Sequence, residues 1–170
     1  MILGATGSGK TKVIQALVDQ IRNKQSKAII IDIKGDYIRH FYDEMRGDII
    51  LNPLDKRGAN WSFFKETDAL KGFDTIATTL MPDAGRDPFW VNAARLIFSE
   101  FAKLYANEDI TLSEFADRLL NSDISKLERA LSNTKAQHLV NQKADKTVVC
   151  VLMMLAIYLS PFKLYNKKEQ

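Results

Sequence analysis

The stretch GATGSGKT, residues 4–11, combines residue types that can hold a phosphate group. It fits the pattern G-x-x-x-x-G-K-[ST], in which glycines let successive backbone N–H groups turn toward an anion. In that pattern Lys10 reaches the β- and γ-phosphates, and the Thr11 hydroxyl binds Mg²⁺. We therefore predict that ATP and Mg bind here, with Thr11 as the metal ligand. The predicted nucleotide ligands are Gly4, Ala5, Thr6, Gly7, Ser8, Gly9, Lys10 and Thr11.

Hydrolysis also needs an acidic group, because a carboxylate near the metal orients the attacking water. The segment IIIDIKGD offers Asp32 at the point where a predicted strand ends. Lys10 and Asp32 are the predicted catalytic residues, although Asp32 and Asp36 fit equally well as residues that end a strand and cap a helix. No strand-like apolar run is followed by Asp-Glu. We therefore expect the chain alone to be inactive as an ATPase.

The residues around this loop show the alternation of helix and strand that is typical of an α/β fold. Residues 12–24 repeat apolar side chains at helical spacing, so a helix should follow the loop. The β-branched runs at 28–31 and 49–51 are typical of strands buried in a parallel sheet, with a short helix near 37–45 between them. The sequence therefore predicts that residues 1–57 form part of a P-loop nucleotide-binding sheet.

From about residue 60 onward the sequence indicates helices alone. Apolar stripes at three- and four-residue steps predict an all-helical domain over 60–162, followed by a polar tail over 163–170. Thr111 or Ser113 is the predicted cap of one of these helices. The aromatic residues Phe89, Trp90, Phe98 and Phe101 are expected in the core of this domain rather than on a base-stacking surface. The helices are expected at 67–81, 89–104, 113–120, 123–131 and 144–159.

Composition narrows the class of protein. Apolar residues make up 46% of the chain, charged residues 26%, and the net charge is +3, which fits a globular protein without a basic stripe for nucleic acid. The apolar run at 148–159 is shorter than the roughly 20 residues that span a bilayer, so we expect a core helix ended by Pro161. The single cysteine, Cys150, lies in this run, which predicts a buried thiol in a reducing, cytoplasmic compartment.

Two further classes of function fit the same residues. Small P-loop kinases join the loop to a helical lid, but lids usually bring clustered arginines to the phosphates, and the arginines here are dispersed. These are Arg86, Arg95, Arg118 and Arg129. The other alternative is a helical DNA- or protein-binding module with a vestigial P-loop. A GTPase does not fit, because the sequence NKKE at 166–169 follows a predicted helix and ends in Glu rather than Asp.

Four segments in sequence order make the chain resemble a known family: GATGSGKT, IIIDIKGDYIRHFYD, ILNPLDKRGANWSFF and DPFWVNAARLIFSE. Their order and spacing resemble the coupling proteins of conjugation and type IV secretion, the TraD/TraG-like group of FtsK/HerA-type P-loop ATPases. The resemblance covers nearly the whole chain. The segments NPLDKRGANW and DPFWVNAAR carry more of it than the phosphate loop does.

This resemblance implies a RecA-like nucleotide-binding domain into which an all-helical domain is inserted, and it places Asp32, Lys34 and Asp36 in a strand-end motif. It implies an ATP-dependent DNA translocase that delivers relaxosome-bound single-stranded DNA to a conjugative or type IV secretion channel. Secretion components would be partners, and the full-length protein would be a homohexamer at the cytoplasmic face of the inner membrane. We expect this chain to be the front portion of such a motor, with the acidic motif beyond Gln170.

Overall fold

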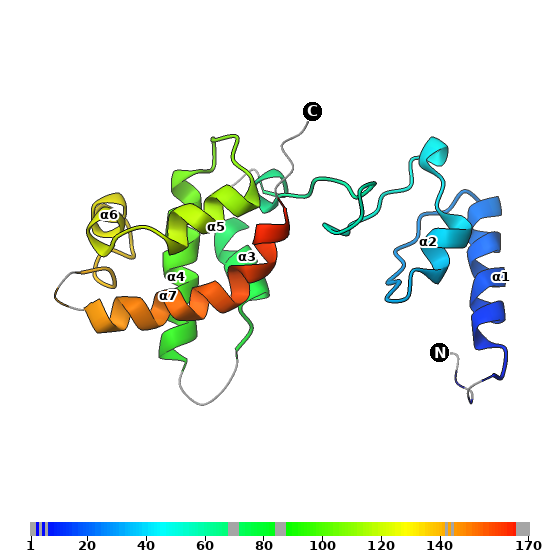
Figure 1. The fold of residues 1–170 in the computed structure, drawn as a ribbon, viewed down its shortest axis with the longest axis horizontal. Helices are drawn as coiled ribbons and strands as arrows, with labels where there is room; N and C mark the ends of the chain where they lie inside the picture. The colour runs from blue at the N-terminus through cyan, green and yellow to red at the C-terminus, as the bar shows by residue number, and fades with distance from the viewer. Residues whose placement is uncertain are drawn as a thin grey trace. The chain divides into compact units, whose positions relative to one another are not determined.

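The computed structural model describes residues 3, 5, 7–67, 72–83, 88–141, 143 and 145–165. The chain divides into two compact units, Met1–Ile49 and Ile50–Gln170. Helices are the regular elements of both units (Figure 1).

The first unit consists of the helices α1 (Lys10–Asn23) and α2 (Asp36–Phe41) and the short 3-10 helix η1 (Glu44–Arg46). The helix expected after the phosphate loop is confirmed, and it begins where Gly9 adopts a left-handed φ of 82°. Its apolar face is mostly exposed, with Val18 as its buried residue. An amphipathic helix requires a second layer to cover that face, and α2 is too short to do so.

The predicted sheet is wrong for the described residues. Within them no residue lies in a β-strand, so this part of the protein is helical with extended connections rather than α/β. Most apolar side chains of the two predicted strands are open to solvent, since Ile29, Ile31 and Ile49 are 99%, 87% and 74% exposed, whereas Ile50 is buried. A parallel strand forms only when a neighbouring strand supplies partners for its backbone N–H and C=O groups. Residues 28–31 and 49–51 have no neighbouring strand among the described residues.

The second unit is helical, as expected. Its elements are η2 (Phe63–Lys65), α3 (Gly72–Leu80), α4 (Phe89–Leu104), α5 (Leu112–Leu120), α6 (Ile124–Ala130), α7 (Asp145–Leu159) and η4 (Ser160–Leu164). Helix α4 lies at the centre, because α3, α5 and α7 all pack against it. Part of the helix expected at 67–81 falls on residues 68–71, which lie outside the described residues.

Phe63 forms the centre of the core of this helical unit. Its ring is fully buried, and its centroid lies 5.4 Å from those of Phe98 and Phe115 and 5.7 Å from that of Phe162. These rings come from η2, α4, α5 and η4, so one side chain joins elements far apart in sequence. The expected core position is confirmed for Phe98 and Phe101, whereas Trp90 is half-buried and Phe89 is 48% exposed.

Helix α5 begins with a complete capping box. The Thr111 hydroxyl accepts the backbone N–H of Glu114 at 3.1 Å, and the Glu114 carboxylate accepts the backbone N–H of Thr111 at 2.9 Å. Two helix N–H groups that lack intrahelical partners are satisfied by this exchange. Of the two caps that the sequence offered, Thr111 is the one used.

Helix α7 is apolar around its whole circumference but is buried along one side only. Val148, Val151 and Leu155 face the core, whereas Cys150 is exposed, so the prediction of a buried thiol is wrong. Apolar residues occupy both faces of this helix, and the apolar run therefore did not reveal which face packs inward. By length and composition the stretch Asp145–Leu164 is apolar enough to cross a membrane, with 28% of it buried. A core helix of a soluble protein meets the same criterion.

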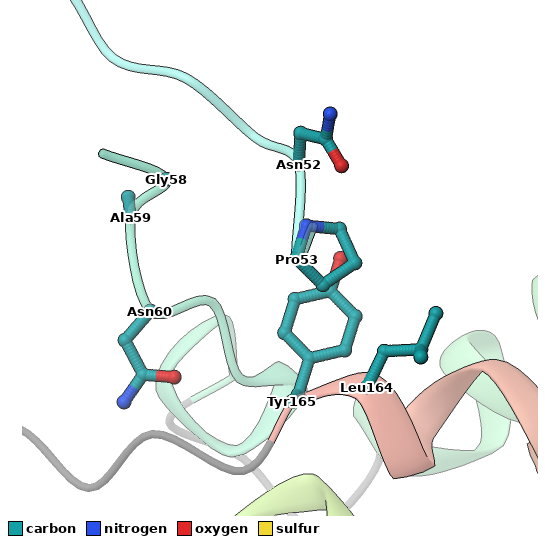
Figure 2. Close-up of a pocket in the computed structure, with 7 residues that line it drawn as sticks. All are labelled: Asn52, Pro53, Gly58, Ala59, Asn60, Leu164 and Tyr165. Atoms are coloured by element: carbon teal, nitrogen blue, oxygen red, sulfur yellow. The ribbon is translucent and has the colours of Figure 1, made fainter. Parts of the chain in front are cut away.

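The beginning and the end of the helical unit lie together. Figure 2 shows the Tyr165 ring beside Pro53, next to the loop that returns through Gly58. The Tyr165 ring also packs edge-on against Trp61, with 6.2 Å between the centroids. The small hollow between these residues, about 10 Å³, has room for a single water molecule. The first residues of the helical unit and its last described residue therefore lie close together.

Candidate functional site

The described residues of the predicted phosphate loop form a tight turn before α1. Gly7 and Gly9 both adopt a φ of 82°, a left-handed conformation that other residues rarely take. The N–H of Ser8 donates to the Ala5 carbonyl at 3.2 Å, which closes the turn, and α1 begins at Lys10. The N-terminal N–H groups of a helix of 14 residues carry partial positive charge. Gly4 and Thr6, two of the predicted ligands, lie outside the described residues.

The Lys10 side chain folds back over this loop. Its ammonium group donates to the Ala5 carbonyl and lies 3.4 Å from the Ser8 hydroxyl. A phosphate in the loop would compete for the same ammonium hydrogens. Thr11 is exposed in the first turn of α1, where its hydroxyl is accessible. In the described part of the chain, no three His, Cys, Asp or Glu residues lie close enough to hold a metal.

Asp32 caps α2. One carboxylate oxygen accepts the backbone N–H of Gly35 at 2.9 Å, and the other accepts those of Tyr37 at 2.8 Å and Ile38 at 2.9 Å. Burial alone would raise the pKa of Asp32. The backbone N–H donors have the larger combined effect, so the pKa of Asp32 lies below its ordinary value. Asp36 is the first residue of α2, and Lys34 is exposed. The capping role that the sequence left open for Asp32 is therefore present, and its catalytic role stays a prediction.

The segment NPLDKRGANW forms a compact loop in the helical unit. Gly58 donates its N–H to the Asp55 carbonyl at 2.9 Å, and Ala59 donates to Ile50 at 2.8 Å. A Cβ atom on residue 58 would lie 2.3 Å from the Asn52 carbonyl oxygen, which is too close for any side chain. This glycine is therefore required by the close approach of two backbone segments rather than by a ligand.

Arg95, from the segment DPFWVNAAR, ties α4 to the end of α3. Its Nε and Nη2 donate to the Met81 carbonyl at 2.8 and 2.5 Å, and its Nη1 lies 2.9 Å from the Asp83 carboxylate. Arg118 is paired with Glu108 at 3.0 Å and lies over the Tyr105 ring. Two of the four dispersed arginines are thus engaged within the helical unit, and Arg86 lies outside the described residues.

Sequence reasoning missed a polar cluster between α3 and α4. The Ser99 hydroxyl donates to Asp74, and Lys103 pairs with Asp74 at 3.2 Å and with the largely buried Glu100 at 2.8 Å. Burial lowers the pKa of Lys103, but the hydrogen bonds to both carboxylates outweigh it and raise that pKa. Each residue lies 25 or more positions from Asp74, so no local sequence pattern indicates the cluster.

An open hollow of about 320 Å³ lies between η2 and the α4–α5 connection. Trp61, Phe64 and Ile110 form its apolar part, and Glu108 and Asp109 lie at its edge. Lys65 also lines the hollow, so side chains of both charge signs lie at its wall.

The type IV secretion-system coupling protein DNA-binding domain family matches residues 1–170. The chain belongs to this family. It is also 36% identical over 162 residues to the coupling protein TraD of Escherichia coli strain K12, covering 94% of this chain and 22% of TraD. The resemblance seen in the sequence is therefore confirmed.

Solved structures of another coupling protein are similar to the chain. The plasmid coupling protein TrwB in complex with ADP and Mg²⁺ matches with a TM-score of 0.79 and 27% identity, over 95% of this chain and 40% of TrwB. TrwB in complex with a non-hydrolysable ATP analogue matches with a TM-score of 0.78 over the same shares. The chain thus spans less than half of the length of each of these coupling proteins.

Proposed function

We propose that this chain is the ATP-binding and DNA-contacting portion of a coupling protein that delivers DNA to a conjugative or type IV secretion channel. Membership of a DNA-binding coupling-protein family is the observation that carries the proposal. The left-handed glycines of the loop and the start of α1 at Lys10 support the nucleotide part. TrwB, a family relative, binds ADP with Mg²⁺.

In this proposal Gly4 to Thr11 surround the phosphates, and Thr11 binds Mg²⁺. Lys10 exchanges the Ala5 carbonyl for the β- and γ-phosphates, a stronger charge-assisted contact. The full-length protein would be a homohexamer at the cytoplasmic face of the inner membrane, with relaxosome-bound single-stranded DNA and secretion components as partners. Family membership argues against the kinase alternative.

Calorimetry with Mg-ATP tests the nucleotide site. We expect Lys10→Ala to abolish measurable binding, because it removes the charge that holds the phosphates. Lys12→Ala is the matched control, since Lys12 is exposed in the same helical turn and lies outside the loop pattern. Equal affinities for wild type and Lys10→Ala would refute the assignment.

A second candidate function is a DNA-contacting helical module whose loop no longer binds nucleotide. Two observations favour it: Lys10 is held by the carbonyl of its own loop, and both Asp32 oxygens are used to cap α2. Under this alternative, Lys10→Ala would leave DNA binding unchanged and neither chain would bind Mg-ATP. DNA binding measured together with calorimetry separates the two functions.

DNA binding by the chain should be weak, sensitive to salt and indifferent to base sequence. The net charge is +3, so few counterions are released on binding, and the affinity depends mainly on phosphate contacts. Titrations with single- and double-stranded DNA at several salt concentrations measure this. Strong preference for one base sequence at physiological salt would contradict it.

ATP turnover by the chain alone should be far below the rate of a motor. Lys10 and Thr11 position phosphates and metal, but hydrolysis also needs a carboxylate to orient water and commonly an arginine worth about 10³–10⁵-fold in rate. A phosphate-release assay with and without DNA measures the rate. Robust DNA-stimulated turnover that Lys10→Ala abolishes would contradict the expectation and make Asp32 the first residue to substitute.

A further inference from the structure

The segment 129–146, which runs from the end of α6 into the first turn of α7, carries the excess positive charge of the chain. It holds four of the 24 Lys and Arg residues but only one of the 21 Asp and Glu residues, so its net charge is +3. The remaining 20 cations and 20 carboxylates of the chain balance each other. We call the four cations of this segment the basic group: Arg129, Lys135, Lys143 and Lys146.

The side chains of the basic group are open to solvent. Helix α6 and the beginning of α7 lie at the same end of the helical unit (Figure 1). Among the described residues, no member of the basic group forms an ion pair, whereas Arg95 and Arg118 are each paired. Lys135 does lower the pKa of Asp74 through its charge. An anion therefore meets these cations without first breaking an ion pair.

The connection that presents these cations is fixed to the core of the helical unit. Leu131, Ala136 and Val140 are fully buried. Between them the backbone turns, because the N–H of Thr134 donates to the Leu131 carbonyl at 3.1 Å and that of Val140 donates to the Ala136 carbonyl at 3.3 Å. Binding residues are often found on loops that a rigid scaffold positions, and this connection has that construction.

The buried carboxylate of Glu100 holds the backbone at Lys135. Glu100 lies on α4 and is 7% exposed. One of its oxygens accepts the Lys103 ammonium at 2.8 Å, and the other accepts the backbone N–H of Lys135 at 3.3 Å. Hydrogen bonds to a charged acceptor are stronger than neutral ones. The polar cluster between α3 and α4 thus also anchors the connection at the point where the Lys135 side chain leaves for solvent.

A nucleic-acid backbone is the partner whose chemistry fits the basic group. Each strand of DNA carries one negative charge per about 3.4 Å of helix axis, so successive phosphates can meet several cations at once. Asn133 and Gln137 are exposed in the same segment, and amide groups donate to phosphate oxygens. The family to which the chain belongs is described as a DNA-binding domain.

We propose that the basic group is the surface through which the helical unit binds the phosphate backbone of DNA. This inference rests on the proposed DNA-contacting function and assigns that function to one end of one unit. Phosphate contacts carry no base information, which agrees with binding that is indifferent to sequence.

Fluorescence anisotropy with a labelled single-stranded oligonucleotide tests the proposal through the salt dependence of binding. Four phosphate contacts give a slope of log K against log salt of about −2.8, which is a loss of affinity of about 50-fold between roughly 50 and 200 mM salt. Lys143→Gln combined with Lys146→Gln should reduce the slope to about −1.4, a loss of about sevenfold over the same range. Substitution of the whole basic group by Gln, the fourfold variant, should bring the slope close to zero.

The matched control removes the same charges elsewhere. Three lysines and one arginine outside the segment are exposed and are replaced together by Gln: Lys24, Lys27, Arg39 and Lys163. This control has the same net charge as the fourfold variant, so a difference between their slopes reports the position of the charges. Its slope should stay near that of the wild type. Lys135→Arg, Lys143→Arg and Lys146→Arg together should also preserve binding, because they keep the charge.

Chemical acetylation of the wild-type chain provides a measurement that needs no variant. With DNA bound, Lys135, Lys143 and Lys146 should react more slowly with an acetylating reagent, as read by mass spectrometry. Lys24 and Lys27 should react as fast as they do without DNA. Unfolding followed by tryptophan fluorescence shows whether the fourfold variant keeps the fold of the helical unit.

The outcomes separate this inference from the function on which it rests. Wild type that binds DNA while the fourfold variant keeps its slope, or DNA that leaves the three lysines fully reactive, would overturn the inference and leave DNA binding in place. Wild type that binds no DNA at about 50 mM salt would overturn both. If polyglutamate of equal charge binds the same residues as tightly as DNA does, the basic group is a surface for an acidic protein, and the assignment to nucleic acid is wrong.

Discussion

Phe63→Ala should be among the most damaging substitutions in the helical unit. The ring is fully buried and contacts rings from α4, α5 and η4. Removing a buried phenylalanine ring costs about 3–5 kcal/mol, a large share of the roughly 5–15 kcal/mol that stabilises a typical domain. With a guanidinium dependence of about 2–6 kcal/mol per molar, the midpoint of unfolding should fall by on the order of 1 M. Trp61 and Trp90 both lie in this unit, so their fluorescence reports its unfolding.

Phe64→Ala is the matched control, because its ring lies 4.3 Å from that of Phe63 but is only half-buried. The control should lose less than half of the free energy of unfolding that Phe63→Ala loses. The reasoning fails if the two substitutions cost the same, or if Phe63→Ala costs less than about 1 kcal/mol, the size of an average substitution.

Three further substitutions probe separate contacts of the helical unit. Thr111→Ala should cost about 1 kcal/mol in chemical denaturation by removing the helix cap, and Thr111→Ser should restore most of it. Arg95→Met should cost about 1–3 kcal/mol because it leaves the Met81 carbonyl without its donor, whereas Arg118→Met, at an exposed ion pair, should cost about 1 kcal/mol or less. Burial raises the pKa of Asp74, but hydrogen bonds from Ser99 and Lys103 hold it below its ordinary value. Its stabilisation is therefore present above the unfolded pKa of about 3.9 and is lost as the pH falls through the folded pKa, so Asp74→Asn should flatten the loss of stability measured from pH 5 to pH 2.

The helices could be predicted from the sequence because their signals are local. Apolar spacing and capping residues lie within a few positions of each other, and Thr111 with Glu114 forms the cap of α5 from a four-residue pattern. The prediction of strands was wrong because strand formation is not decided by a local pattern. The run at 28–31 has the composition of a buried strand, yet Ile29 is 99% exposed. Strand formation depends on a second segment that supplies the hydrogen bonds, and composition cannot show whether that segment is beside it.

The exposure of Cys150 has a similar cause. A helix buried on one side usually shows its orientation through polar residues on the other side. Val149, Cys150, Met153 and Ile157 remove that signal from α7, and the sequence alone gave no way to tell its inner face from its outer face. Val148, Val151 and Leu155 form the buried side because α7 packs against α4 and α5. These contacts join elements far apart in the sequence, so the local pattern does not show them.

The two most specific family segments and the residues that would bind nucleotide lie in different units. Gly58 and Arg95, in the two most specific segments, are explained by a close backbone approach and by a helix-end contact within the helical unit. The phosphate loop lies in the first unit, where Lys10 contacts Ala5 and Asp32 caps α2. These two segments therefore owe their specific residues to the helical fold, and their likeness to the family would survive the loss of nucleotide binding. For this reason Lys10→Ala, rather than any further similarity between sequences, decides whether this chain binds ATP.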